Sequence, residues 1–167
     1  MVDSVAPSVS AFLVPSISTT HTIPITTFTA SDTIGVTGYF INEELLAPSV
    51  ANPGWSSTPQ TSYTVSADGY TILVSWAKDA LGHISSPIDR TVLVDTTPPE
   101  VTAFSIPATA TARRVDITTF TALDNIPADH GNTPISGYLI TESATAPLVG
   151  NPGWSSTPQT SYFFTSD

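Results

Sequence analysis

Hydrophobic and polar residues alternate along this chain in short runs, which are separated by clusters of Pro, Gly, Asn and Ser. Alternation places side chains on opposite faces of an extended strand, and the clusters are typical of turns. In the clearest run, residues 70–78, we expect Ile72, Val74 and Trp76 to face a core. The pattern predicts an all-β sandwich without a long amphipathic helix. Strands are predicted at residues 9–14, 22–30, 36–42, 63–66, 70–78 and 88–94.

Two of these predicted strands have irregular patterns. Residues 36–42 are apolar on both faces, which favours a central position in a sheet. Within residues 22–30 the apolar positions change phase between Ile25 and Phe28, and copies of these residues recur at Ile117 and Phe120. A change of phase in a strand predicts a β-bulge.

The chain contains two copies of one sequence unit. Residues 52–63 recur without change as residues 151–162, and residues 26–30 recur as residues 118–122. An identical block of this length does not arise by chance, so we infer two copies of one structural unit. The second copy has extra residues within 124–135, a stretch rich in Pro, Gly, Asn and Asp that we interpret as a loop.

The second copy is shorter at its far end. Asp167 aligns with Asp68, and residues 69–94 of the first copy, which hold its last two predicted strands, have no counterpart. Each large core residue contributes roughly 2–5 kcal/mol, whereas a whole domain is stable by only about 5–15 kcal/mol. We therefore expect that the second copy does not close as a sandwich alone. Either another chain supplies the strands, or the sequence belongs to a longer array.

Composition narrows the class of partner. The chain has 4 Lys and Arg against 14 Asp and Glu, with a formal net charge of −10. This balance argues against nucleic acid and anionic membrane surfaces, and no apolar run approaches the roughly 20 residues that insertion needs. The absence of Cys removes disulfides and thiolate chemistry. No signal peptide follows Met1, which fits a mature fragment or a cytosolic protein, and the repeat favours the fragment.

Two motifs resemble those of a known family. Residues 68–72, followed by residues 77–83, resemble the D-G-x-Y turn and the A-x-D-x-x-G-N segment of bacterial immunoglobulin-like and fibronectin type III-like surface repeats, with His83 in place of the usual Asn. Residues 95–99 resemble the D-T-T-x-P joint of these repeats. The resemblance implies tandem immunoglobulin-like, Greek-key β-sandwiches, with residues 1–95 as the first and 96–167 as an incomplete second copy. It also implies an extracellular or cell-surface location.

Four carboxylates are predicted to gather where the two copies join: Asp68, Asp95, Asp124 and Asp129. Some repeats of the family resembled here bind Ca²⁺ at such joints, so the resemblance implies an interdomain Ca²⁺ site. Converging carboxylates repel one another unless a hard cation lies between them. The alternative is that they are turn and linker residues whose side chains bond their own backbone. We expect no other cofactor, and we interpret residues 79–82 as a hairpin turn.

Catalytic chemistry has little support in the sequence. The histidines, His21, His83 and His130, lie in no motif with a nucleophile. The adjacent acids Glu43 and Glu44 would point to opposite faces of a strand, so they could not cooperate as acid and base. We therefore expect that the protein is not an enzyme.

The leading expectation is a non-catalytic structural or adhesive repeat of a bacterial extracellular protein, acting as a spacer or stalk. Its partners would be other repeats of the same protein or neighbouring copies. One alternative is a filament or assembly subunit whose second sandwich is completed by strands from a neighbouring chain. Another is a carbohydrate-binding accessory module of a secreted enzyme, in which Trp55 and Trp154 would stack on a surface glycan. Their matched loops favour a packing role, as a lid over the core.

Overall fold

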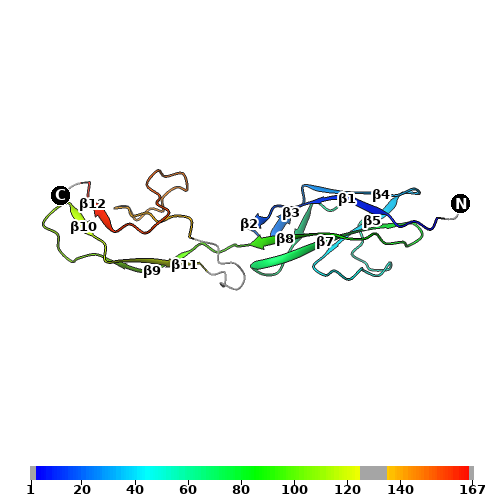
Figure 1. Ribbon diagram of the computed structural model, residues 1–167, viewed down its shortest axis with the longest axis horizontal. Helices are drawn as coiled ribbons and strands as arrows, with labels where there is room; N and C mark the ends of the chain where they lie inside the picture. Colours follow the sequence, from blue (N-terminus) through cyan, green and yellow to red (C-terminus); the bar gives the residue numbers. More distant parts are fainter. Residues whose placement is uncertain (1–2, 125–134, 166–167) are drawn as a thin grey trace. The chain divides into compact units, whose positions relative to one another are not determined.

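The computed structural model describes residues 3–124 and 135–165 (Figure 1). The chain divides into two compact units, unit 1 (Met1–Thr96) and unit 2 (Thr97–Asp167). Every regular element among the described residues is a β-strand, which confirms the prediction of an all-β fold. The strands form several sheets, an arrangement consistent with a β-sandwich. In the described part of the chain, no helix has the length and hydrophobicity that a membrane crossing requires.

Unit 1 contains one larger sheet and two strand pairs. The larger sheet has the strand order β2-β8-β7-β5, in which β2 runs parallel to β8 and the other neighbours are antiparallel. The two antiparallel pairs are β1 with β4 and β3 with β6. The strands are β1 (Ser8–Leu13), β2 (Ile17–Ser18), β3 (Thr22–Pro24), β4 (Thr27–Ser31), β5 (Val36–Asn42), β6 (Ser62–Thr64), β7 (Gly69–Asp79) and β8 (Ile88–Val94).

The change of phase within residues 22–30 is a change of partner strand. Residues 22–24 pair with β6, whereas residues 27–31 pair with β1. The backbone N–H of Ile25 donates to the Thr61 carbonyl at 2.9 Å, and the next N–H, that of Thr26, donates to Leu13 at 2.9 Å. The predicted bulge at this position is therefore wrong. The chain crosses here from one strand pair to the other.

The core of unit 1 gathers residues from all of its longer strands. The rings of Phe12 and Phe28 meet edge to face with centroids 5.4 Å apart, and Phe28 meets Tyr39 in the same way at 5.1 Å. Such edge-to-face pairs add to the stabilisation that burial of the rings provides. The buried core cluster consists of Val9, Phe12, Ile23, Ile25, Phe28, Ile41, Val65, Leu73, Ala77, Val92 and Val94.

Strand β7 is covered on both faces, because Val74 and Trp76 of the predicted face are buried together with Leu73 and Ala77 of the other. Leu73 and Ala77 are fully buried members of the core cluster, whereas the side chain of Ile72 is 41% exposed. Trp76 is also buried, and its Nε1 donates to Asn42 Oδ1 at 3.0 Å. The expectation of burial is therefore confirmed for Val74 and Trp76 and wrong for Ile72, because alternation does not say how much of a strand is covered.

Strand β5 lies at an edge of the four-stranded sheet, so its predicted central position is wrong. Its outer edge is partly covered by a bridge in which Tyr39 and Ser56 exchange backbone hydrogen bonds of 2.7 and 2.9 Å. Phe40, on the opposite face from the core residue Ile41, packs on the Trp55 ring at a centroid distance of 5.3 Å. Apolar residues on both faces therefore reflect a loop that packs against an edge strand.

Unit 2 repeats the two strand pairs of unit 1. Its strands are β9 (Glu100–Ser105), β10 (Arg114–Asp116), β11 (Thr119–Leu123) and β12 (Ser161–Phe163), with β9 paired to β11 and β10 to β12. The change of partner also recurs, since Ile117 N–H donates to Thr160 and Thr118 N–H donates to Ser105. Among the described residues of unit 2, no strands correspond to β7 and β8.

Candidate functional site

Strands β7 and β8 cover one side of the hydrophobic core of unit 1. Leu73 and Ala77 of β7 are fully buried, as are Val92 and Val94 of β8. These four side chains pack in one cluster with residues of β1 and β4, including Phe12. Removal of this two-stranded cover would expose the opposite half of the core to water.

Among its described residues, unit 2 has no such cover on the corresponding face. Val101 is 55% exposed and Phe104 is 45% exposed, whereas their unit 1 counterparts, Val9 and Phe12, are buried. The rings nevertheless keep their arrangement, because Phe104 meets Phe120 edge to face at 5.4 Å. A surface pocket of about 310 Å³ results, and we call it the open face. It is lined by Val101, Phe104, Phe120, Leu139, Ile140 and Thr141.

A second pocket of unit 2 shares Leu139, Ile140 and Thr141 with the open face, and it contains a carboxylate with a counterpart in unit 1. In unit 2, Glu142 accepts hydrogen bonds from the Tyr162 hydroxyl at 3.3 Å and from the Thr165 N–H and hydroxyl at 2.8 and 3.0 Å. The Thr165 backbone N–H is the main reason that the pKa of Glu142 lies below its ordinary value. Burial and the neighbouring Glu142 charge raise the pKa of Tyr162. This corner of unit 2 therefore favours an ionised carboxylate.

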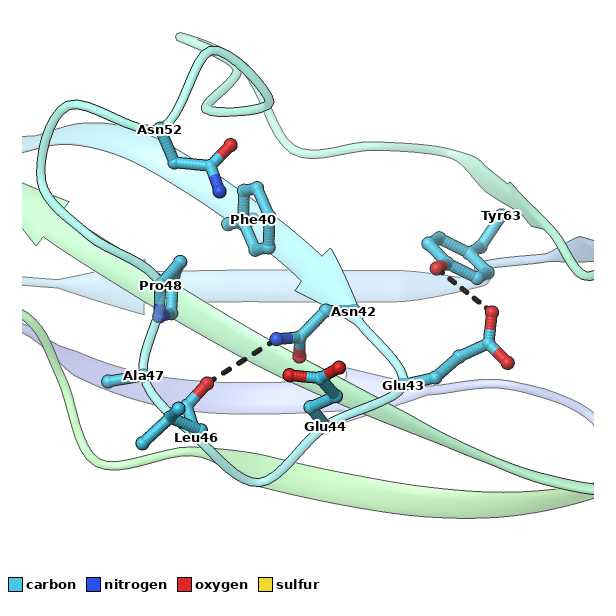
Figure 2. A pocket seen from close by; sticks show the side chains of 9 residues that line it. All are labelled: Phe40, Asn42, Glu43, Glu44, Leu46, Ala47, Pro48, Asn52 and Tyr63. Atoms are coloured by element: carbon cyan, nitrogen blue, oxygen red, sulfur yellow. Dashed lines mark hydrogen bonds between the residues drawn. The ribbon is translucent and has the colours of Figure 1, made fainter.

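The matching carboxylate in unit 1 lies at a pocket of about 610 Å³ beside the end of β5 (Figure 2). Glu43 accepts from the hydroxyls of Tyr63 and of Thr71 in β7, each at 3.2 Å. Burial and the Glu43 charge raise the pKa of Tyr63. Glu43 and Glu44 both line this pocket, and Figure 2 shows the Glu43 carboxylate turned toward Tyr63 and the Glu44 carboxylate turned away from it.

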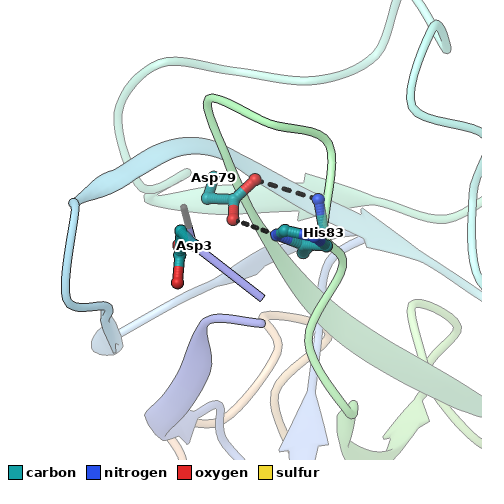
Figure 3. Close-up of side chains that lie close together, drawn as sticks. All are labelled: Asp3, Asp79 and His83. Carbon is teal, nitrogen blue, oxygen red and sulfur yellow. Dashed lines mark hydrogen bonds and ion pairs between the residues drawn. The ribbon is translucent and has the colours of Figure 1, made fainter. Parts of the chain in front are cut away.

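A second cluster joins the N-terminal segment of unit 1 to the turn after β7 (Figure 3). Within the part of the chain that the structure describes, one group of three His, Asp or Glu side chains is close enough together to hold a metal ion. It consists of Asp3, Asp79 and His83, whose possible ligand atoms lie within 4.8 Å of one another. Carboxylates and imidazole are ligands for divalent cations. Asp3 Oδ2 is also buried without a hydrogen-bond partner.

Hydrogen bonds of the turn already engage the Asp79 carboxylate. It accepts from the backbone N–H groups of Leu81 and His83 at 2.8 and 2.9 Å, and it lies 2.7 Å from His83 Nδ1. Gly82 closes the turn with φ of +90°, which confirms the predicted hairpin turn. Burial alone would raise the pKa of Asp79, but the hydrogen bonds from His83 and Leu81 outweigh it and lower the pKa.

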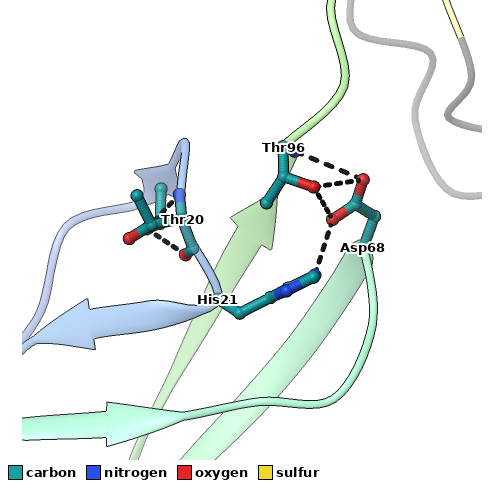
Figure 4. Close-up of polar contacts among 5 residues, drawn as sticks. Thr20, His21, Asp68 and Thr96 are labelled. Carbon is teal, nitrogen blue, oxygen red and sulfur yellow. Dashed lines mark hydrogen bonds and ion pairs between the residues drawn. The ribbon is translucent and has the colours of Figure 1, made fainter.

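Asp68, one of the four residues predicted to bind Ca²⁺, holds the start of the linker (Figure 4). Its carboxylate accepts from the Thr96 N–H at 3.2 Å and from the Thr96 hydroxyl at 2.9 Å. His21 Nε2 lies 2.9 Å from the same carboxylate, within hydrogen-bond distance. This contact between a turn and a linker was missed by sequence reasoning, although the alternative role as a turn and linker residue points toward it.

The other three predicted Ca²⁺ ligands are distributed over both units. Asp95 lies in unit 1, where its backbone N–H donates to the Ser18 carbonyl at 2.9 Å, and Asp124 lies in unit 2. Asp129 lies outside the described residues. The interdomain site therefore stays a prediction. The cluster that contains Asp3 was not predicted, although Asp3 aligns with the proposed ligand Asp95.

The matched tryptophans pack against their own units. Trp55 packs at a tilt on Phe40, its ring centroid lies 4.8 Å from Lys78 Nζ, and its Nε1 donates to the Ser49 carbonyl at 2.9 Å. Trp154 makes the equivalent Nε1 bond at 3.0 Å to Leu148 and is 40% exposed. These contacts favour a packing role over glycan stacking. The packing is on the outer side of β5, whereas we expected a lid over the core.

Comparisons with family models, with curated proteins and with solved structures found no match to this chain. The resemblance to bacterial surface repeats therefore depends on the quoted motifs.

Proposed function

We propose that the chain is a non-catalytic structural repeat module of a bacterial extracellular protein, in which immunoglobulin-like units are joined in series as a spacer or stalk. Such a protein works by holding a distal element at a set distance, so it requires repeated units of one fold and linkers of restricted conformation. Its partners are further repeats of the same kind. A surface with few basic groups and a formal net charge of −10 suits a soluble extracellular module.

The observation that carries the proposal is the repetition of framework hydrogen bonds in both units. The hydroxyls of Ser10 and Thr29 join β1 to β4 at 2.7 Å, and those of Thr102 and Thr121 join β9 to β11 at 2.8 Å. The Tyr39–Ser56 bridge also recurs between the residues aligned with them in unit 2. The recurrence of individual hydrogen bonds supports the view that both units are repeats of one strand arrangement.

The held linker supports the mechanical part of the proposal. Thr96 is the last residue of unit 1, and the Asp68 carboxylate accepts hydrogen bonds from its backbone N–H and from its hydroxyl. Because two donors of one residue meet one carboxylate, the backbone direction at Thr96 is restricted. A spacer needs this restriction, since a freely rotating joint would lose the set distance.

The experiment measures the distance between the two units by electron spin resonance. The chain has no Cys, so Ser86→Cys and Ala144→Cys, both at exposed positions, place one spin label in each unit. The proposal predicts one narrow distance distribution for the labelled chain. Asp68→Ala should broaden it at least about twofold, because hydrogen bonds to a charged carboxylate are lost at the joint.

The control is Asp89→Ala, which removes an exposed carboxylate at the end of β8 opposite to the linker. It should leave the distribution unchanged, showing that loss of negative charge alone has no effect. A broad distribution in the labelled parent chain would contradict the spacer role.

A further inference from the structure

We propose that the open face of unit 2 binds a β-hairpin of the kind that residues 69–94 form in unit 1. The duplication identifies the binding partner, because unit 1 shows that β7 and β8 cover the strands equivalent to those of unit 2. The inference does not depend on the spacer role, since it concerns recognition by one face of unit 2.

The first support is apolar complementarity. In unit 1 the hairpin presents Leu73, Ala77, Val92 and Val94, all fully buried against the core. In unit 2 the pocket that would receive such side chains is lined mainly by apolar residues and remains open to solvent. Burial of this surface is the driving force for binding, at roughly 25 cal/mol for each Å² removed from water.

The second support is the segment of unit 2 that corresponds to β5. In unit 1, β5 pairs with β7 so that Gly38 lies opposite Lys78 and Phe40 opposite Trp76. Residues 137–141 of unit 2 keep the bridge on their other side, because Tyr138 and Ser155 exchange hydrogen bonds of 2.7 and 2.9 Å. No described strand pairs with the side that corresponds to β7. The incoming hairpin adds there in the register of unit 1.

The third support is a position for a cation. In unit 1, Lys78 of β7 passes over Gly38, lies 4.8 Å from the Trp55 ring centroid and donates to the Val50 carbonyl at 2.8 Å. In unit 2 the three heavy atoms nearest to a Cβ at the aligned Gly137 all belong to Trp154, which is 40% exposed. The lysine of an incoming hairpin therefore finds an aromatic ring beside a glycine that leaves room for it.

Glu142 gives the bound state a recognisable signature. Glu43 of unit 1 accepts a hydrogen bond from the hydroxyl of Thr71 in β7. Glu142 instead accepts hydrogen bonds from the N–H and the hydroxyl of Thr165. A bound hairpin carries the residue equivalent to Thr71 to the same carboxylate. It therefore competes with Thr165, and the Thr165 amide should lose its hydrogen bond on binding.

The experiment adds a synthetic peptide of residues 69–94 to the ¹⁵N-labelled 167-residue chain. The inference predicts saturable shifts at the amides of residues 137–141 and at Thr165, with amide protection rising at least about tenfold for residues whose N–H groups join the ladder. Ile140→Asp in the chain, or Leu73→Asp in the peptide, should weaken binding at least about tenfold by placing a charge in an apolar contact. Leu148→Asp is the matched control, because Leu148 is already 82% exposed.

A second format covers the case in which the peptide aggregates. The sequence of residues 69–94 is appended to the chain through a flexible linker, with Leu73→Asp in the appended copy as its control. Protection of residues 137–141 that the control abolishes supports the inference. Lack of protection in this format overturns it, as does protection that survives Ile140→Asp. A homodimer of the unmodified chain through this face also overturns it, because the occupant is then a second copy.

Discussion

Units 1 and 2 share a frame but differ in what covers it. Phe12 and Phe104 make the same edge-to-face contact at 5.4 Å with their partner rings, yet Phe12 is fully buried and Phe104 is 45% exposed. Local strand pairing and ring geometry therefore depend on residues that both copies contain. Burial depends on β7 and β8, which only unit 1 has among the described residues.

This difference separates two contributions to a β-sandwich. Backbone pairing and short-range side-chain contacts define where each strand runs, because they are satisfied within a pair of strands. The larger stabilisation comes from removing apolar surface from water, and it requires the second layer. A repeat can thus keep the shape of its frame while most of its driving force depends on additional strands.

The largest expected effect contrasts the two matched phenylalanines. Phe12→Ala should destabilise unit 1 by about 3–5 kcal/mol, because a fully buried ring leaves a cavity. Phe104→Ala should destabilise unit 2 by about 1 kcal/mol or less, because much of its ring already contacts water. Urea unfolding followed by NMR signals assigned to each unit measures both values. Equal losses in the two units would show that the open face is covered in solution.

A smaller effect is expected from the turn after β7, which has no counterpart among the described residues of unit 2. The pKa of Asp79 is lowered in the folded unit, although burial acts in the opposite direction. Its stabilising contribution is therefore fully present above the ordinary carboxylate pKa of the unfolded chain. That contribution is lost as the pH falls through the lowered pKa.

Asp79→Asn should accordingly flatten the acid limb of the stability profile of unit 1. The measurement is the urea midpoint of unit 1 between about pH 7 and about pH 3. Asp89→Asn, at an exposed position on β8, is the control and should retain the acid limb of the parent chain. An unchanged profile in Asp79→Asn would mean that other carboxylates determine the acid sensitivity.

Strand positions could be predicted from the sequence because the signal is local. The predicted bounds of residues 36–42 and 88–94 match β5 and β8. Alternation and turn residues act over a few positions, so they mark strands without reference to the rest of the chain. The repeat likewise indicated where a frame would recur, and the change of partner at Ile25 recurs at Ile117.

Sheet order and site geometry could not be predicted in the same way. The edge position of β5 depends on which strand pairs with β7, a choice made between segments far apart in sequence. The proximity of Asp3 to Asp79 and the hydrogen bond from Thr96 to Asp68 also join residues that lie far apart in the sequence. Glu43 and Glu44 follow the predicted end of β5, but the pocket that they line also includes Tyr63, which lies 20 residues beyond Glu43.

The most direct test of the central claim compares amide exchange at Phe40 with that at Leu139. The N–H groups of Tyr39 and Tyr138 both donate to a serine carbonyl at 2.7 Å, so in each unit the next N–H along the chain faces the side that β7 occupies in unit 1. We predict that the Leu139 amide exchanges at least about 100-fold faster than the Phe40 amide. The Tyr39 and Tyr138 amides should differ far less. Equal protection of Leu139 and Phe40 in the isolated chain would contradict the account.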